Sequence, residues 1–133
     1  MKDAPPGFEP LFRTSPYLDL LGPIYSARGE SGLVLGLWAE EKHCNARNVV
    51  HGGVFSSIAD VALGYSAAFA TDEPMPLVTV NLTLDYAGSA KLGDWIEIRT
   101  DVQRVGRRMA YVNGYFVVGE KRIVRSSAVF AAS

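Results

Sequence analysis

One long apolar stretch constrains the fold of this chain more than any other feature. It runs from Asn48 to Ala70, reads NVVHGGVFSSIADVALGYSAAFA, and contains a single charged residue, Asp60. Its length and continuity predict one helix. Small side chains are frequent in it: Ser56, Ser57, Ala59, Ala62, Gly64, Ser66, Ala67 and Ala68. Because small side chains let another backbone approach closely, we expect a curved sheet to enclose this helix on most sides.

The segment that precedes the long helix predicts a short helix and a hairpin. SPYLDLLG offers Ser15 as an N-cap, Pro16 at the first helical position and Gly22 as a stop. Residues 24–39 alternate in hydrophobicity and predict a hairpin that turns at residues 29–32.

The segment that follows the long helix predicts four strands. Residues 77–86 alternate between apolar and polar side chains, as a half-buried strand does. Three further strands are expected within residues 95–105, 109–119 and 122–132, separated by glycine-containing turns. Residues 1–15 hold three of the seven prolines and predict an irregular arm. This order of elements predicts an α+β domain with an antiparallel sheet.

The composition limits the classes of protein to which the chain can belong. Its 133 residues fit one domain that spans residues 1–133. The formal net charge of -1 offers no basic surface for nucleic acid. The N-terminal residues lack the apolar run of a signal peptide or a membrane span, so we expect neither export nor membrane association. The single cysteine, Cys44, cannot form an intramolecular disulfide, which favours a cytoplasmic setting.

Two other kinds of site find little support in the sequence. His43 and Cys44 resemble a Cys–His pair, but neighbouring residues on a strand point to opposite faces, which argues against a cysteine nucleophile. The chain has two histidines and no cluster of cysteines, so we expect no metal site.

The start of the long helix suits a developing negative charge. The first amides of a helix have no acceptor within the helix, and glycine lets a ligand approach the backbone closely. The amides of Gly52 and Gly53, at the positive end of the helix dipole, could therefore form an oxyanion hole. The alternative is that both glycines ease a tight turn and that His51 caps the helix. Asp60, if enclosed by apolar side chains, needs a partner or becomes neutral.

These two chemical groups are too far apart to act together within one helix. Asp60 lies seven residues beyond Gly53 and nine beyond His51, which places it about 10–13 Å along the helix axis at 1.5 Å per residue. Reacting groups must approach to about 3–3.5 Å. If both groups act on one substrate, they come from two copies of the chain, in a symmetric dimer with antiparallel helices.

The stretch from Asn45 to Asp60, NARNVVHGGVFSSIAD, closely resembles the hot-dog-fold acyl-CoA thioesterases. It is most similar to the branch that includes the phenylacetate-pathway thioesterase. VTVNLTLDYAGSAKLGD and VGRRMAYV extend the resemblance, which covers roughly residues 40–130. It implies a hot-dog fold, in which a curved antiparallel sheet wraps around one long central helix. It also implies dimers that pair edge to edge and often assemble further into tetramers.

The resemblance implies roles for residues near the helix. Gly52 would supply the oxyanion-hole amide, and Asp60 of the partner subunit would act as the nucleophile or as a general base on water. Asn45 would help to hold the thioester carbonyl or the attacking water. His51 would support the loop, and Thr79 would lie near the water.

The resemblance also implies a place for coenzyme A. Tyr86 and the RVGRR segment would lie beside the nucleotide, and that segment contributes Arg104, Gly106, Arg107 and Arg108. Three arginines around one turn make a local phosphate site in a chain of near-zero net charge. The alternative is a solvated hairpin turn.

The expected reaction is hydrolysis of an acyl-CoA to a free acid and CoA, with CoA as part of the substrate and no separate cofactor. Phenylacetyl, hydroxylated aromatic and medium-chain acyl groups all remain open. We expect the N-terminal arm and helix residues of the partner subunit, such as Leu63, Gly64 and Tyr65, to line the acyl pocket. A hot-dog dehydratase would need a histidine motif that this chain lacks. The other alternative is a non-catalytic module that binds or senses acyl-CoA.

Overall fold

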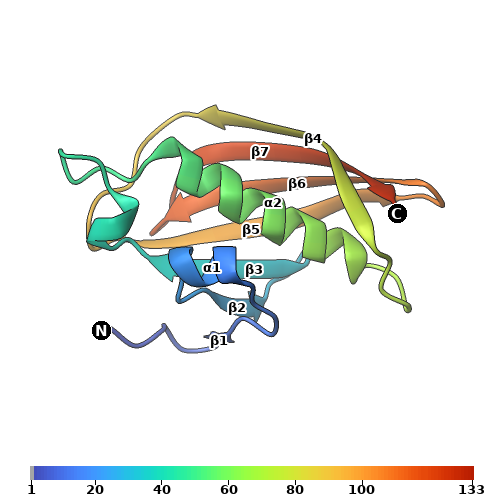
Figure 1. Ribbon diagram of the computed structural model, residues 1–133, viewed down its shortest axis with the longest axis horizontal. Coiled ribbons are helices and arrows are strands. Elements are labelled where there is room, and N and C mark those ends of the chain that lie inside the picture. The colour runs from blue at the N-terminus through green and yellow to red at the C-terminus, as the bar shows by residue number, and fades with distance from the viewer. Residues whose placement is uncertain (1) are drawn as a thin grey trace.

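A computed structural model describes residues 2–133, so the first residue of the predicted arm and domain lies outside it. Within these residues, one antiparallel sheet of seven strands curves around a single long helix, α2 (Gly52–Ala68) (Figure 1). The strands are β1 (Glu9–Pro10), β2 (Tyr25–Arg28), β3 (Leu33–Trp38), β4 (Leu77–Tyr86), β5 (Trp95–Val105), β6 (Met109–Val118) and β7 (Lys121–Ala132). The helix α1 (Pro16–Leu21) and the 3₁₀ turn η1 (Glu41–His43) are short. The predicted α+β class is confirmed.

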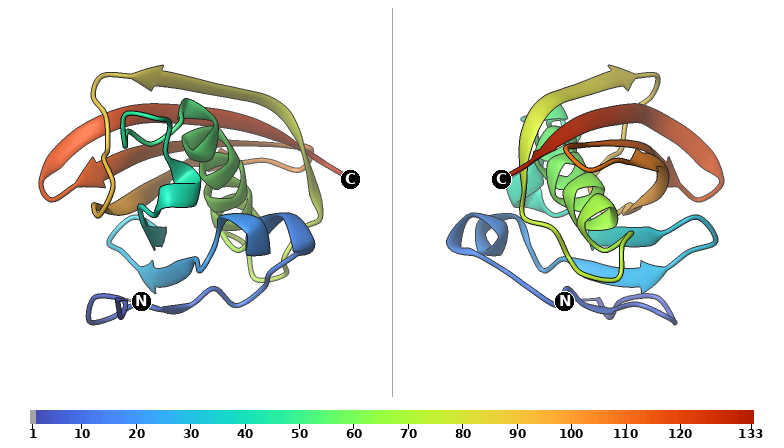
Figure 2. Two further views of the ribbon diagram at one scale, coloured as in Figure 1. Left: turned by 60° about the vertical axis from the view of Figure 1, so that its left-hand side comes forward. Right: turned by 90° about the vertical axis from the view of Figure 1, so that its right-hand side faces the viewer.

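The strands follow the order β1-β2-β3-β5-β6-β7-β4 across the sheet. The predicted hairpin β2–β3 and the later strands β5, β6 and β7 pair with their neighbours in the sequence. β4 precedes β5 in the chain but pairs with β7 at the far edge. The chain therefore leaves β3, forms α2 and β4, and returns to the middle of the sheet with α2 on the concave side (Figure 2).

The short helix α1 begins and ends where the sequence predicts. Ser15 is the N-cap, and its hydroxyl accepts a hydrogen bond from the amide of Leu18 (3.3 Å). Pro16 occupies the first turn, and the amide of Gly22 donates to the carbonyl of Leu18 (2.8 Å).

The concave side of the sheet buries one face of α2 fully. The buried face repeats at helical spacing and consists of Phe55, Ile58, Ala59, Ala62, Leu63, Ser66 and Ala67. The opposite face, which carries Asp60, Val61 and Gly64, is half-buried, and Gly53 at its start is exposed. The expected wrapping of the sheet around the helix is confirmed, since β3, β4, β5, β6 and β7 all contact α2 and β4 reaches Asp60 through Thr79, while the face with Val61 is left half-buried.

β4 forms an open edge of the sheet, because its only partner is β7. Leu82 and Leu84 are half-buried, as the alternation predicts, but Val78 and Val80 are 52% and 58% exposed. A β-bulge between Thr79 and Asn81 interrupts the register at Val80. The predicted half-buried strand is thus confirmed only for its second half.

The N-terminal arm packs on the outer side of the sheet and is not wholly irregular, since Glu9–Pro10 pairs with β2. Phe8 meets the Trp95 ring edge-on at 5.1 Å, and Trp38 lies 5.0 Å from it. Gly36 lies directly beneath this cluster, where a Cβ atom would stand 2.3 Å from the Trp95 ring. The aromatic cluster therefore requires glycine at position 36.

Gly36→Ala should lower the free energy of unfolding by about 1–3 kcal/mol, because the indole of Trp95 cannot move without disturbing its packed neighbours. Gly106→Ala is the matched control, since a Cβ atom there makes an ordinary 3.4 Å contact, and we expect a change within about 0.5 kcal/mol. Denaturant unfolding measures both variants. Equal stability of the two would contradict the packing argument.

Candidate active site

Asp60 lies on the half-buried face of α2 and not in the apolar core. Its carboxylate accepts a hydrogen bond from the Thr79 hydroxyl (2.7 Å), which β4 brings across from the edge of the sheet. The resemblance implies that Thr79 lies near the water, and this role stays a prediction. The carboxylate therefore has a polar partner and a route to solvent or to a ligand, which explains how a charged group fits in an apolar helix.

The first turn of α2 presents free backbone amides. Among the hydrogen bonds of residues 2–133, none is donated by the amides of Gly52 or Gly53. Both glycines have ordinary negative φ, and a Cβ atom on Gly53 would meet nothing within 4 Å. Backbone conformation thus does not require them, which weakens the alternative that they serve only a tight turn. His51 occupies the N-cap position, but its exposed side chain makes no capping hydrogen bond.

Asn45 shapes the loop that leads into α2. Its side-chain oxygen accepts hydrogen bonds from the amides of Arg47 (2.9 Å) and Val49 (3.2 Å). Asn48 in the same loop adopts φ of 60°, a left-handed conformation that asparagine tolerates. Asn45 therefore stabilises the loop within one chain, and no contact joins it to Asp60.

Within one chain, the amides and the carboxylate stay apart. Gly52 and Asp60 are eight residues apart on α2, or about 12 Å along the axis. The separation that the sequence predicts is therefore present in the folded chain.

The structure separates the residues expected at the nucleotide. The Tyr86 hydroxyl donates to the Gly52 carbonyl (2.7 Å), so this ring lies at the start of α2. The β5–β6 turn with Arg104, Arg107 and Arg108 lies at the other end of the sheet (Figure 1). Strand register gives the distance between Tyr86 and this turn. Met109, at the end of the turn, pairs with Ala131 of β7, which in turn pairs with Val78 of β4. Val78 lies eight residues from Tyr86 along β4, so the turn and Tyr86 are about 25 Å apart. Tyr86 and the arginines therefore do not share a site within one chain, and their expected place beside the nucleotide stays a prediction.

The arginine turn itself carries a shallow cavity of about 540 Å³. It is lined by Arg104, Gly106, Arg107, Arg108, Met109 and Tyr111. None of the three arginines forms an ion pair with a described carboxylate. The turn therefore keeps its positive charge available, as a phosphate site requires.

His43 and Cys44 do not form a nucleophile and base. His43 is buried, its Nδ1 accepts from the Glu40 amide (2.9 Å), and its Nε2 donates to the carbonyl of Leu21 (2.6 Å). It therefore ties η1 to α1. Partial burial, together with the Glu41 carboxylate, raises the pKa of the Cys44 thiol, which disfavours the thiolate.

Metal binding and membrane spanning are two further possibilities for residues 2–133. Three or more His, Cys, Asp and Glu side chains do not gather there in an arrangement that could hold a metal ion. Nor is any helix in this part of the chain both long and apolar enough to cross a membrane.

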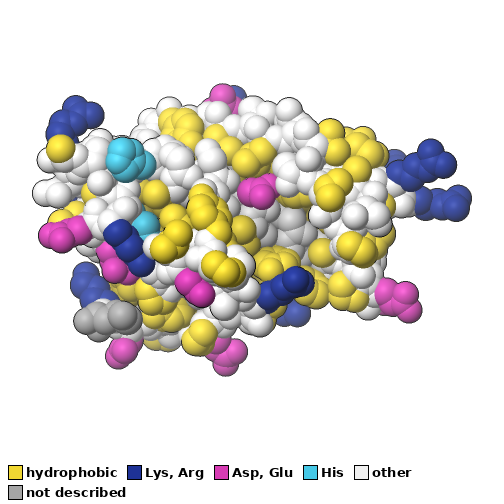
Figure 3. Space-filling model, viewed as in Figure 1, with side chains coloured by type: hydrophobic (Ala, Val, Ile, Leu, Met, Phe, Trp, Pro, Cys, Tyr) yellow, Lys and Arg dark blue, Asp and Glu magenta, His cyan; other side chains and the backbone are white. Residues whose placement is uncertain are grey.

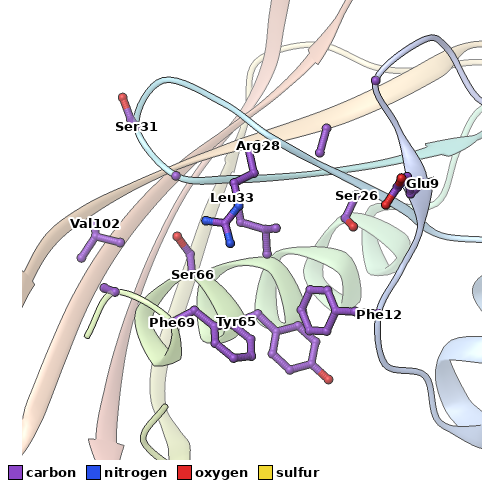
Figure 4. A pocket seen from close by; sticks show the side chains of 14 residues that line it. Glu9, Phe12, Ser26, Arg28, Ser31, Leu33, Tyr65, Ser66, Phe69 and Val102 are labelled. Carbon is purple, nitrogen blue, oxygen red and sulfur yellow. The ribbon is translucent and has the colours of Figure 1, made fainter. Parts of the chain in front are cut away.

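A cavity of about 700 Å³ opens between the second half of α2, the β2–β3 hairpin and the arm (Figure 4). Phe12, Tyr65 and Phe69 form one wall, with ring centroids 5.0–6.0 Å apart. Arg28 and Ser66 point into the cavity from β2 and from α2. Tyr65 and the arm line this cavity within one chain, whereas Leu63 is fully buried and neither it nor Gly64 lines the cavity. The acyl pocket that the sequence predicts with the partner's helix stays a prediction.

The floor of this cavity has a fixed hydrogen-bond direction. The Thr100 hydroxyl donates to the carbonyl of Leu33 (2.6 Å), which uses its only proton. The Ser66 hydroxyl must therefore donate to Thr100 (2.8 Å), and only its lone pairs remain for the cavity. Nothing in the sequence indicates this pair, because Ser66 and Thr100 lie on different elements. The contact of Tyr86 with Gly52 was missed for the same reason.

The comparisons with known proteins agree with this architecture. The family model of the thioesterase superfamily matches residues 47–124. Protein PA0474 of Pseudomonas aeruginosa is 47% identical over 131 residues, which cover 98% of each chain. Human acyl-coenzyme A thioesterase 13 is 30% identical over 95 residues, which cover 71% of this chain and 67% of the human protein.

Solved structures show the same fold. Zebrafish thioesterase superfamily member 2 aligns with a TM-score of 0.82 at 23% identity, over 90% of this chain and 88% of that one. A mutant of the phenylacetic acid degradation protein PaaI from Thermus thermophilus aligns with a TM-score of 0.78 at 19% identity, over 90% and 100% of the two chains. The curved sheet around one helix, the family match and the sequence relatives lead to one conclusion: this chain belongs to the thioesterase superfamily and is a hydrolase with the hot-dog fold.

Proposed function

We propose that this protein hydrolyses acyl-CoA thioesters to a free acid and CoA. The observation that carries the proposal is the Asp60 carboxylate, held by Thr79 on an open helix face that also begins with two free amides. The relative named acyl-coenzyme A thioesterase supports the choice of substrate class. CoA is part of the substrate, so the reaction needs no separate cofactor or metal.

In the proposed reaction, Asp60 acts in one of two ways. It takes a proton from water, whose oxygen attacks the thioester carbonyl, or it attacks the carbonyl itself and forms a mixed anhydride that water later hydrolyses to the free acid and Asp60. The carbonyl oxygen gains negative charge, which the amide of Gly52 stabilises, by roughly 3–4 kcal/mol in comparable sites. The C–S bond then breaks, and the thiolate of CoA leaves and takes up a proton. Thr79 keeps the carboxylate oriented through its hydrogen bond.

We further propose that each site combines two chains. Asp60 and Gly52 of one chain lie about 12 Å apart on one helix. The face of α2 that the sheet leaves open has many hydrophobic side chains around it (Figure 3), and the neighbouring edge of β4 exposes Val78 and Val80. An antiparallel copy that covers this face would place Gly52 of one subunit opposite Asp60 of the other, twice. Such dimers could pair further into a tetramer.

The same arrangement accounts for the separated nucleotide residues. The arginine turn lies at the end of the sheet away from the start of α2. In an antiparallel dimer, the turn of one chain approaches the Gly52 end of its partner. Arg104, Arg107 and Arg108 would then bind the phosphates of CoA while Gly52 of the partner binds the carbonyl.

The cavity beside Tyr65 would receive the acyl group. Tyr65 follows Asp60 by five residues on α2, about 7.5 Å along the axis and about 140° around it, so the acyl group would pass around the helix to reach the cavity. The cavity volume of about 700 Å³ exceeds what an acetyl group needs. Aromatic rings in its wall favour phenylacetyl, hydroxylated aromatic or medium-chain acyl groups over short ones. The single cysteine agrees with a reaction in the cytoplasm.

Asp60→Asn should reduce kcat by roughly 10²–10⁴-fold, because an amide can neither attack nor accept the proton of water. Asn keeps an oxygen for Thr79, so the fold should persist. Thiol release from a panel of acyl-CoAs measures the loss. Asp85→Asn is the control, since the Asp85 carboxylate is exposed on β4, the strand that carries Thr79, and pairs with Arg125 (3.0 Å). Full activity in Asp60→Asn would refute the assignment, and binding without hydrolysis by the unaltered protein would favour a sensor.

A complementation experiment tests the two-chain site. Gly52→Pro removes the amide proton, and proline suits the first position of a helix. His51 has φ of -60° and ψ of 139°, a conformation open to a residue before proline. Gly52→Pro and Asp60→Asn should each be inactive alone. Coexpression should restore about a quarter of the unaltered activity, because about half the dimers are mixed and each has one intact site. Coexpressed dimers without activity would show that each site lies within one chain.

Phe12→Ala should lower kcat/KM for aromatic and medium-chain acyl-CoAs by roughly tenfold and leave acetyl-CoA unchanged, because it removes one aromatic wall of the cavity. Leu20→Ala is the control, since Leu20 is exposed on α1 and does not line the cavity. Steady-state kinetics with acyl-CoAs of graded size measure both. Equal losses for acetyl-CoA and longer substrates would show that the cavity does not hold the acyl group.

A further inference from the structure

The first turn of α2 lacks the usual stabilising groups. It begins with Gly52 and Gly53, which lose more conformational entropy on folding than any other residues. The N-cap residue His51 makes no side-chain hydrogen bond to the turn, and the turn contains no acidic residue to complement the helix dipole. A helix that starts in this way frays readily unless another element holds it.

Tyr86 supplies that hold from the end of β4. Its hydroxyl donates to the Gly52 carbonyl (2.7 Å), and the Ser56 hydroxyl lies 3.3 Å from the hydroxyl oxygen of Tyr86. The ring meets Phe55 edge-on at 6.1 Å and would touch a Cβ atom on Gly52 at 3.4 Å. No other described side chain makes a hydrogen bond to the backbone of Gly52 or Gly53.

The end of β4 is itself firmly placed. Tyr86 pairs with Val124 in β7. The next two amides, of Ala87 and Gly88, both donate to the carbonyl of Ile123 (2.9 Å each). The ring therefore projects from a backbone that the sheet fixes, and its hydrogen bond transmits that position to the start of the helix.

We propose that Tyr86 is a positioning residue that holds the amides of Gly52 and Gly53 in place for the thioester carbonyl. The inference rests on the proposed function of these amides. It assigns Tyr86 a role different from a contact to the nucleotide. The only hydroxyl proton of Tyr86 is committed to the Gly52 carbonyl, so the oxygen has only lone pairs for other groups. A phosphate accepts hydrogen bonds, so it gains nothing from such an oxygen.

Tyr86→Phe tests the proposal, because it removes the hydroxyl and keeps the ring. We expect kcat to fall by roughly fivefold, the effect of one neutral hydrogen bond, with KM and inhibition by free CoA unchanged. Tyr17→Phe is the matched control. The hydroxyl of Tyr17, on α1, forms a hydrogen bond with the Ser57 hydroxyl on α2 (2.5 Å) and makes no hydrogen bond to Gly52. This control should keep the kcat of the unaltered protein. A higher KM and weaker CoA inhibition with unchanged kcat in Tyr86→Phe would overturn the proposal in favour of a nucleotide contact.

A second measurement needs no substrate. Amide hydrogen exchange at Gly52 and Gly53 should become several-fold faster in Tyr86→Phe and stay unchanged in Tyr17→Phe. Unchanged exchange in Tyr86→Phe would overturn the proposal. If the unaltered protein hydrolyses no acyl-CoA, the proposed function fails, and the exchange rates still decide whether Tyr86 holds the first turn.

Discussion

The close packing of α2 on the concave face of one sheet is the interaction on which the rest of the structure depends. Small residues make it possible on both sides of the contact. Ala59 and Ala62 are fully buried on the helix. Gly114 on β6 leaves room for the side chain of Leu63, since a Cβ atom there would stand 2.9 Å from it. The opposite face meets the sheet mainly at the edge strand β4 and is only half-buried, which leaves it free for a ligand or a second chain.

β4 joins the chemistry of that free face to the edge of the sheet. It contacts α2 through Thr79 at Asp60 and through Tyr86 at Gly52. The same strand is the open edge on which a second copy could pair. In the proposed dimer, one strand would therefore position a carboxylate for one site and an amide for the other. A substitution that shifts β4 would then alter the geometry of both sites.

Much of the fold could be predicted from the sequence because its signals are local. Ser15, Pro16 and Gly22 bound α1 as expected, since a cap, a first-turn proline and a stop act within one turn of chain. The later strands also form where alternation predicts them. The exposed half of β4 was not predictable, because alternation reports which side chains share a face and not whether anything covers that face. A β-bulge at Val80 also interrupts the alternation.

The sequence by itself determined the spacing of the two candidate groups and that one helix keeps them apart. Asp60 and Gly52 stand at a fixed spacing, and helix geometry converts spacing into distance without any tertiary contact. Only the tertiary structure decided which partners these groups have. Strand order and register set the hydrogen bond of Thr79 to Asp60 and that of Tyr86 to Gly52. They also set the distance of Tyr86 from the arginine turn. Register is set by packing across the whole sheet, so these contacts between residues distant in the chain leave no local pattern.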